Sequence, residues 1–267
     1  YTWMPQAALL GLQRGLPVIL EAHDRISGRI GPLLFRQFVR KTGKKRLLVI
    51  TQALLKKLEA QFTGLSALDI QIAPNGVELE QYENLPEAAT AREVLGLPKK
   101  LTAVYSGHFY AGRGVELLVE IAAAFPQVSF VWAGGRPADI DRLRQRLHKQ
   151  QIENVTLTGF IPNRRLPLYQ AAGDILLMPY ELSIAGSSGG NSAEICSPMK
   201  MFDYLAAGRA ILTSDLAVFH EVLTHENAVF CQPEDVQSWQ TALSRLLNDP
   251  DLRHRLGTRA RQDASNY

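Results

Sequence analysis

The sequence predicts an α/β protein with parallel strands, and three observations support this fold class. Short apolar runs alternate with stretches of helical periodicity along the 267 residues, as in successive strand–helix units. Several apolar runs end in glycine-containing turns that lead into the next helix. A polar stretch at residues 78–86 separates a short first series of these units from a longer second one, and it is predicted to be a linker or surface loop.

The first series, residues 1–73, is predicted to be a partial domain. The expected helices cover residues 5–13, 30–41 and 52–61, and the expected strands cover residues 18–20, 47–50 and 70–73. Three strands are too few for a doubly wound sheet, so we expect this domain to be truncated at its N-terminal side.

The second series, residues 74–267, is predicted to be complete. Its expected strands cover residues 101–106, 128–133, 155–158, 175–178, 210–213 and 228–231. Helical stretches lie between most of them. Six parallel strands form a complete doubly wound sheet, in which ligands bind beyond the carboxyl ends of the strands.

The bulk composition is that of a soluble globular protein, with 46% hydrophobic and 21% charged residues. Two cysteines do not make a disulfide framework, so a reducing cytoplasm is the expected location. No apolar run approaches the roughly 20 residues that a membrane-spanning helix needs.

Positive charge is concentrated in the first series. Residues 1–72 carry 11 Lys and Arg against 4 Asp and Glu, whereas the remainder carries 18 against 22. The predicted helix at 30–41 mixes basic and apolar residues, which is typical either of peripheral contact with an anionic membrane or of an ordinary amphipathic helix packed on its sheet. The basic run matches no nucleic-acid-binding motif, so nucleic acid is not an expected partner.

The segment SPMKMFDYLAAGRAIL, residues 197–212, is the most informative stretch for function. Ser197 is predicted to be the N-cap of a helix, with Pro198 at its first position and Gly208 at its end. The free amides and the helix dipole at such an N-terminus favour a phosphate, and Lys200 adds a positive charge there. Asp203, one turn further on, can accept hydrogen bonds from sugar hydroxyls. Together these features predict a site for a nucleoside diphosphate sugar.

A glycine-rich loop, residues 105–114, joins a predicted strand to a predicted helix. Gly107 and Gly112 let the backbone approach a ligand, and Arg113 stands where a helix dipole favours an anion. A P-loop is excluded because Gly114 occupies the position of its magnesium-binding hydroxyl. The alternative to diphosphate binding is a tight turn with a solvated arginine.

Three further loops are weaker candidates. Phe160 and Ile161 follow the strand at 155–158 and either present backbone groups to a base or form a structural turn. The polar loop from Glu181 to Glu194 is either a binding loop or without function. His23 follows the strand at 18–20, where it is either a proton carrier in a cleft or structural. The six histidines show no metal-ligand spacing, so no metal site is predicted.

Taken together, these segments resemble the retaining glycosyltransferases of the GT-B fold, the group 1 family that uses nucleotide sugars. The resemblance rests on six motifs in the family's order: VILEAHD (18–24), APNGVELEQY (73–82), YSGHFYAGRGVELL (105–118), NVTLTGFIP (154–162), AAGDILLMPY (171–180) and SPMKMFDYLAAGRAIL (197–212), the last in the variant with Ser-Pro and a lysine. It covers nearly the whole chain and implies a complete C-terminal donor domain beside the C-terminal part of an acceptor-side domain.

The resemblance also implies roles for individual residues. Arg113 and Lys200 would bind the diphosphate of a UDP- or GDP-linked sugar, Asp203 would hold the ribose, and His23 would approach the transferred sugar. The implied donor-binding set is Gly107, Gly112, Gly114, Phe160, Ile161, Glu194, Ser197, Pro198, Met199 and Asp203. No metal or other cofactor is implied. The implied acceptor is a glycan or a lipid-linked molecule at the cytoplasmic face of the membrane.

The sequence departs from the family pattern at three positions. Asp203 stands where the family usually has glutamate, and Ile195 stands where a second glutamate is common, with Glu194 one residue away. Arg113 replaces the usual lysine. These departures leave open a nucleotide-sugar-binding module without turnover, while a sugar-nucleotide epimerase of the same fold fits the Ser-Pro segment less well.

Overall fold

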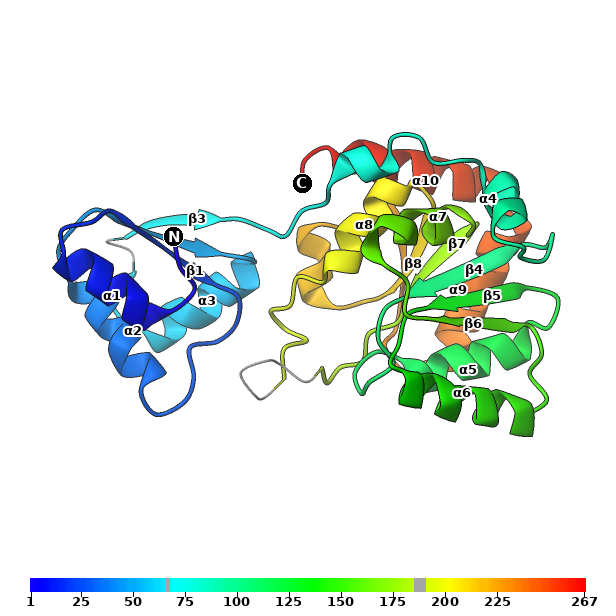
Figure 1. Cartoon of the computed structure of the whole chain (residues 1–267), viewed down its shortest axis with the longest axis horizontal. Helices are drawn as coiled ribbons and strands as arrows, with labels where there is room; N and C mark the ends of the chain where they lie inside the picture. Colours follow the sequence, from blue (N-terminus) through cyan, green and yellow to red (C-terminus); the bar gives the residue numbers. More distant parts are fainter. Residues whose placement is uncertain (66–67, 185–190) are drawn as a thin grey trace. The chain divides into compact units, whose positions relative to one another are not determined.

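The computed structural model describes residues 1–65, 68–184 and 191–267, and it divides into two compact units (Figure 1). Unit 1 consists of Tyr1–Asn75, Ser183–Ser197 and Ala217–Glu221, and unit 2 consists of Gly76–Leu182, Pro198–Leu216 and Val222–Tyr267. The sequence predicted one boundary at 73/74. It did not predict that two later segments belong to the first unit, because local patterns do not show where a chain returns to an earlier unit.

Unit 1 is a three-stranded parallel sheet with helices. The sheet has the order β1 (Val18–Ala22), β2 (Lys45–Val49), β3 (Asp69–Ile72), and the helices are α1 (Pro5–Gln13), α2 (Gly31–Arg40) and α3 (Gln52–Gln61). The predicted elements are confirmed, with small differences at the strand ends. Phe35 and Phe38 of α2 are fully buried with Leu47 of β2, so this helix packs one face into the core.

Unit 2 is a six-stranded parallel sheet, as predicted. Its strands are β4 (Thr102–Ser106), β5 (Ser129–Ala133), β6 (Val155–Gly159), β7 (Ile175–Met178), β8 (Ala210–Ser214) and β9 (Ala228–Cys231), in the spatial order β6-β5-β4-β7-β8-β9. The chain builds outward from β4 to β6 and then returns to pair β7 on the other side of β4. The carboxyl ends of β4 and β7 therefore form a topological switch point, where open α/β sheets bind ligands.

Helices cover both faces of this sheet (Figure 1). They are α4 (Ala88–Val94), α5 (Val115–Ala124), α6 (Pro137–Lys149), α7 (Leu166–Ala171), α8 (Met199–Ala207), α9 (Val236–Asn248) and α10 (Pro250–Ala264). Figure 1 shows α5 and α6 on one side of the sheet and α7 and α8 on the other. Every residue of β4, β5, β7 and β8 is buried, which explains their continuous apolar runs.

The stretch at 78–86, predicted to be a linker or surface loop, contains more order than expected. A 3₁₀ helix, η2 (Leu79–Tyr82), interrupts it, and Tyr82 is 6% exposed. One aromatic residue in a polar segment carries no periodic signal, so its burial was not predicted. Among the described residues, no helix is long and apolar enough to span a membrane.

Candidate functional site

Lys200, in the first turn of α8, brings its ammonium group to the switch point of unit 2. The Nζ atom is inaccessible to solvent and has no hydrogen-bond partner among the described residues. It lies 4.0 Å from the ring centroid of Tyr105, in β4, and 5.3 Å from that of Tyr180, just after β7. Burial lowers the pKa of Lys200 well below its usual value, and the nearby Arg113 lowers it further. A buried cation that has no hydrogen-bond acceptor among the described residues favours an anionic ligand.

Gly107 makes room for this ammonium. A Cβ at position 107 would lie 2.8 Å from Lys200 Nζ and 3.2 Å from the Tyr105 hydroxyl, and φ is +147°. The glycine amide donates to the carbonyl of Ala133. The glycine predicted here therefore serves a close approach between the end of β4 and the lysine.

Arg113 is held by two tyrosine rings. Its guanidinium carbon lies 4.9 Å from the ring centroid of Tyr110 and 4.6 Å from that of Tyr180, and it donates a hydrogen bond of 2.6 Å to the Tyr110 hydroxyl. Tyr180 thus contacts both predicted diphosphate ligands, Arg113 and Lys200. The two side chains predicted to bind a diphosphate converge in the structure.

Two backbone amides of the glycine loop are hydrogen-bonded to a side chain of the same unit. The amides of Gly112 and Gly114 each donate a 3.1 Å hydrogen bond to the carboxylate of Glu181. Gly114 has φ +65°, and a Cβ there would lie 2.2 Å from the carbonyl oxygen of Pro179. Glu181 therefore occupies the positive end of α5 in this structure, and the predicted donor-binding roles of Gly112 and Gly114 remain predictions.

Asp203 lies one turn after Lys200 in α8, and the Tyr82 hydroxyl is among the groups that act on the pKa of its carboxyl group. Burial raises the pKa of Asp203 to about 6, against the opposing effects of Tyr82 and Lys200. Tyr82 is anchored in turn by a 2.9 Å hydrogen bond to Oε1 of Gln170. The predicted ribose ligand is thus a partly buried carboxyl group that shares its surroundings with Lys200.

The start of α8 differs from the prediction. The helix begins at Met199 and its N-cap is Pro198, without a side-chain cap. Ser197, predicted to be the N-cap, belongs to unit 1, where its carbonyl accepts from Asn75 and its buried hydroxyl has no partner among the described residues. The prediction placed Pro198 one position too far into the helix. Gly208 ends the helix with φ +64°, as predicted.

A family model described as glycosyl transferases group 1 matches residues 100–249. The chain belongs to this family. The match includes the glycine loop and the whole of α8, the two segments that supply Arg113 and Lys200.

Two curated relatives of this group 1 chain are similar at low identity. The alpha-D-kanosaminyltransferase of Streptomyces kanamyceticus is 24% identical over 177 residues, which are 64% of this chain and 43% of that protein. The putative teichuronic acid biosynthesis glycosyltransferase TuaC of Bacillus subtilis is 23% identical over 245 residues, which are 90% of this chain and 57% of that protein. The chain thus spans about half the length of these relatives.

The predicted fold class is confirmed by solved structures. HepE of Anabaena, in complex with UDP, matches 98% of this chain and 71% of its own with a TM-score of 0.80 at 16% sequence identity. Sucrose-phosphate synthase of Thermosynechococcus elongatus matches 99% of this chain and 68% of its own, with a TM-score of 0.74 at 18% sequence identity. At these identities the comparison shows a shared fold.

The remaining predicted residues of the group 1 chain contribute less. Phe160 follows β6 with 75% of its surface exposed, and Met199 is 57% exposed, whereas Ile161 is half-buried. In unit 1, His23 is half-exposed with Nε2 3.2 Å from the carboxylate of Glu21. These residues have the access that a ligand needs, and their predicted roles remain untested.

Glu194 and Ile195 are placed within unit 1. The Glu194 carboxylate pairs with Arg25 at 2.7 Å and Lys57 at 2.9 Å, and these cations lower its pKa. Ile195 is 1% exposed in the core of unit 1, and its carbonyl accepts from Thr51. Because Glu194 already has two cationic partners, we leave it out of the donor site proposed below. Residues 185–190 of the predicted binding loop lie outside the described residues.

Sequence reasoning missed the aromatic and acidic residues that support the site. Tyr105, Tyr180 and Tyr82 surround Lys200 and Asp203, and Glu181 holds the glycine loop. Tyr180 and Glu181 directly follow a predicted strand, so their position at a strand end was a usable signal. Tyr82 offered none.

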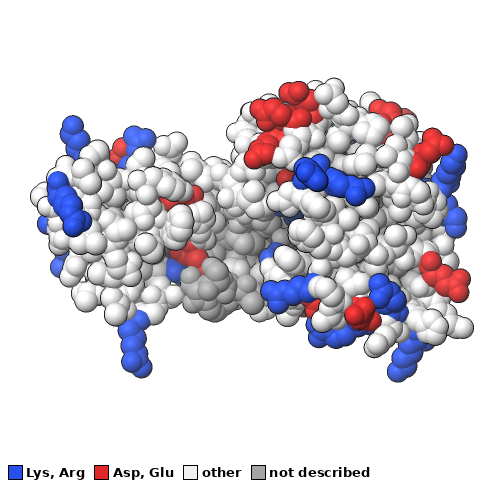
Figure 2. Space-filling view, in the orientation of Figure 1, with Lys and Arg blue, Asp and Glu red and all other residues white. Residues whose placement is uncertain are grey.

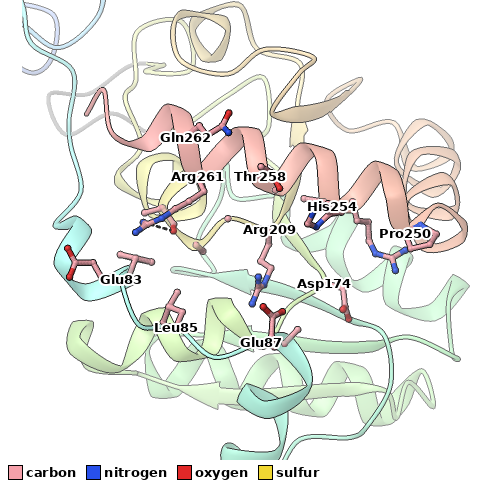
Figure 3. Close-up of a pocket in the computed structure, with 18 residues that line it drawn as sticks. Glu83, Leu85, Glu87, Asp174, Arg209, Pro250, His254, Thr258, Arg261 and Gln262 are labelled. Atoms are coloured by element: carbon pink, nitrogen blue, oxygen red, sulfur yellow. Dashed lines mark hydrogen bonds between the residues drawn. The ribbon is translucent and has the colours of Figure 1, made fainter.

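A second groove in unit 2, of about 520 Å³, has polar walls whose cations are already paired (Figure 3). Arg209 donates to the carbonyls of Pro86 and Ala171, and Arg261 donates to that of Ala206. Asp174 accepts from Arg92 and the amide of Thr102. Among the described residues that line this groove, Arg209 and Arg261 thus have hydrogen-bond acceptors, unlike the Lys200 ammonium. Among the residues that the structure describes, no three His, Cys, Asp or Glu side chains gather to hold a metal.

Proposed function

We propose that this chain is part of a glycosyltransferase that moves a sugar from a nucleoside diphosphate sugar to an acceptor, with unit 2 binding the donor. The observation that carries the proposal is the buried Lys200 ammonium, which has no hydrogen-bond acceptor among the described residues and lies beside Arg113 at the sheet's switch point. A diphosphate supplies the acceptor that Lys200 lacks and further acceptors for the guanidinium of Arg113. HepE, which shares the fold, binds UDP, so UDP is the first donor nucleotide to test.

The proposed chemistry follows from charge. When the bond between the anomeric carbon and the β-phosphate oxygen breaks, the electron pair remains on that oxygen and negative charge grows on the diphosphate. Lys200 and Arg113 stabilise this charge more in the transition state than in the bound donor, which lowers the barrier. Arg113 presents a planar fork, and the rings of Tyr110 and Tyr180 hold it in place. Asp203 accepts hydrogen bonds from the ribose hydroxyls and fixes the register of the donor.

The finer parts of the proposal rest on the family resemblance. We propose that the anomeric configuration is retained, that His23 approaches the transferred sugar, and that the two cations act without a metal ion or other cofactor. NMR of the product anomer tests the first of these. Activity in excess EDTA tests the last, because a metal-dependent enzyme would lose turnover.

The proposed acceptor is a glycan or a lipid-linked molecule, and unit 1 contributes to its site at the cytoplasmic face of a membrane. The name of TuaC refers to the biosynthesis of teichuronic acid. Figure 2 shows more Lys and Arg than Asp and Glu on the visible face of unit 1, which carries α1–α3 in Figure 1. Helix α2 buries its phenylalanines and exposes Leu33 between basic residues. Sedimentation with anionic but not with zwitterionic vesicles would support membrane contact.

Calorimetric titration and thermal melting with UDP and GDP test the donor site. A nucleoside diphosphate at about 100 times its dissociation constant stabilises the fold by about 2.7 kcal/mol. Lys200→Ala and Arg113→Ala should weaken the diphosphate far more than the free nucleoside, whereas Lys149→Ala and Arg142→Ala on the exposed face of α6 should weaken neither. Absence of binding by either diphosphate would contradict the proposal.

Turnover separates the two functions that the sequence left open. Release of nucleoside diphosphate that depends on an added acceptor indicates a transferase. Binding of the donor without such release, in the full chain, indicates a nucleotide-sugar-binding module.

A further inference from the structure

In the sheet of unit 2, strands β4 and β7 stop pairing with each other before either strand ends. Among the described residues, the last pair of their ladder is Val104 with Leu176. Each strand continues beside its outer neighbour, β4 beside β5 as far as Ser106 and β7 beside β8 as far as Met178. The two central strands therefore separate at their carboxyl ends, which is where the switch point of the sheet lies.

The hydroxyl of Tyr204, in α8, lies between the two separated strand ends. It accepts a hydrogen bond of 2.9 Å from the amide of Ser106 and donates one of 3.1 Å to the carbonyl of Leu177. In the register of this ladder, the next hydrogen bond would run directly from the Ser106 amide to the Leu177 carbonyl. The tyrosine oxygen thus separates two backbone groups that would otherwise pair. We call this arrangement of amide, hydroxyl and carbonyl the Tyr204 bridge.

The bridging hydroxyl makes every hydrogen bond that it can. It also accepts from Ser106 Oγ at 3.2 Å, and Gln170 Nε2 donates to that Oγ at 3.3 Å. A tyrosine oxygen has one proton to donate and two positions to accept, which matches its three bonds. Tyr204, Ser106 and Gln170 are all buried, so water does not compete for these groups. A buried hydroxyl with all its bonds formed holds the strand ends in one arrangement.

The same helix brings Lys200 to the same two strand ends. Lys200 and Tyr204 are one turn apart on one face of α8. The Lys200 ammonium lies 4.0 Å from the ring centroid of Tyr105, in β4, and 5.3 Å from that of Tyr180, just after β7. The distance between β4 and β7 therefore determines how much room the ammonium has.

We propose that Tyr204 is a positioning residue that holds β4 and β7 apart and thereby fixes Lys200 at the diphosphate site. The inference rests on the proposed function. Without the hydroxyl, the Ser106 amide and the Leu177 carbonyl would pair with each other, because unpaired buried backbone groups are costly. Such a bond brings nitrogen and oxygen to about 2.9 Å and draws the two strand ends together.

The room around the Lys200 ammonium is too small to absorb this movement. Gly107 directly follows Ser106, and a Cβ added there would lie 2.8 Å from Lys200 Nζ. A shift of the end of β4 toward β7 therefore displaces the ammonium. The predicted cost falls on the contact between Lys200 and the diphosphate, and the rest of the nucleotide is affected less.

NMR of the full chain tests the bridge without a ligand. A scalar coupling across a hydrogen bond connects the amide nitrogen with the carbonyl carbon of its acceptor. Wild type should show no such coupling between Ser106 and Leu177, because the hydroxyl separates them. Tyr204→Phe should show it, because the ladder closes. A coupling in wild type, or its absence from folded Tyr204→Phe, would overturn the inference.

Ligand titration followed by NMR tests the link to Lys200. It compares the nucleoside diphosphate that wild type binds, UDP or GDP, with the free nucleoside. Tyr204→Phe should raise the dissociation constant of the diphosphate about tenfold, as expected when one hydrogen bond to a charged group is lost. It should leave that of the nucleoside unchanged, which a general loss of structure would not do. Tyr169→Phe, on α7, is the matched control and should change neither.

If Tyr204→Phe does not fold, 4-aminophenylalanine at position 204 replaces it. The amine still donates to the Leu177 carbonyl, but it is a poor acceptor for the Ser106 amide. The bridge is therefore weakened and not removed. Diphosphate binding should fall several-fold while nucleoside binding stays the same, and an unchanged diphosphate affinity would overturn the positioning role.

The outcomes separate this inference from the proposed function. Equal weakening of both ligands, or an unchanged diphosphate affinity in folded Tyr204→Phe, overturns the role of Tyr204 while the donor site stands. Failure of the wild-type chain to bind any nucleoside diphosphate overturns the proposed function. The coupling between Ser106 and Leu177 needs no ligand, so it decides on the bridge in either case.

Discussion

The ammonium of Lys200 lies 4.0 Å from the centre of the Tyr105 ring, in a space that exists because residue 107 has no side chain. The ring face offers the cation a weak electrostatic partner, which does not replace the water lost on burial. The unliganded site thus holds a charge that is incompletely compensated. A bound diphosphate would supply the negative charge that the unliganded site lacks. The free energy gained by pairing the Lys200 ammonium favours binding.

Gly107→Ala should abolish diphosphate binding while the protein stays folded. The added Cβ would lie 2.8 Å from Lys200 Nζ, so the ammonium must move away from the site. The positive φ of residue 107 adds strain of about 1 kcal/mol or more. Gly96→Ala, where φ is also positive but no atom lies within 4 Å, measures the strain alone. Titration with UDP should show a loss in the first variant and no change in the second.

Lys200→Met should stabilise the unliganded protein and eliminate diphosphate binding. Replacing a buried, unpaired charge with an apolar side chain of similar length removes its desolvation cost, about 1–3 kcal/mol. The unfolded lysine keeps its proton up to pH 10.5, whereas the folded pKa is lower, so wild-type stability rises with pH across that interval. The advantage of Lys200→Met in urea unfolding should therefore shrink toward pH 10.5. A less stable variant at pH 7 would contradict this account.

The parallel sheet of unit 2 and the convergence of Arg113 and Lys200 could both be predicted from the sequence. Continuous apolar runs show buried strands, and glycine turns show where those strands end. The position of Ser197 outside the helix could not be predicted, because a serine before a proline has the pattern of an N-cap whether or not the helix begins there. Nor did the sequence show that Glu181 takes the amides of the glycine loop. That bond joins residues 67 positions apart, and side-chain contacts over such separations leave no local pattern.

Asp203→Asn should remove a pH dependence from the stability of the protein. The pKa of Asp203 is about 6 in the folded state and 3.8 in the unfolded chain, so between these values the folded state holds a proton that the unfolded chain has lost. Wild-type stability therefore falls as pH rises from about 4 to 6, by an amount of the order of 3 kcal/mol. The difference between wild type and Asp203→Asn in urea unfolding isolates this group from other carboxylates. A difference that is constant between pH 4 and pH 7 would show that Asp203 titrates normally.

Glu181→Ala should destabilise unit 2 and loosen Arg113 without removing a predicted ligand. The carboxylate accepts from two backbone amides at the N-terminus of α5, and losing such a cap costs about 1 kcal/mol. Because Gly112 flanks Arg113, we expect weaker UDP binding as the loop loses its fixed conformation. Glu153→Ala, an exposed glutamate outside the site, is the matched control. Thermal melting and UDP titration measure both effects. Tighter UDP binding by Glu181→Ala would show instead that the carboxylate competes with the diphosphate for these amides.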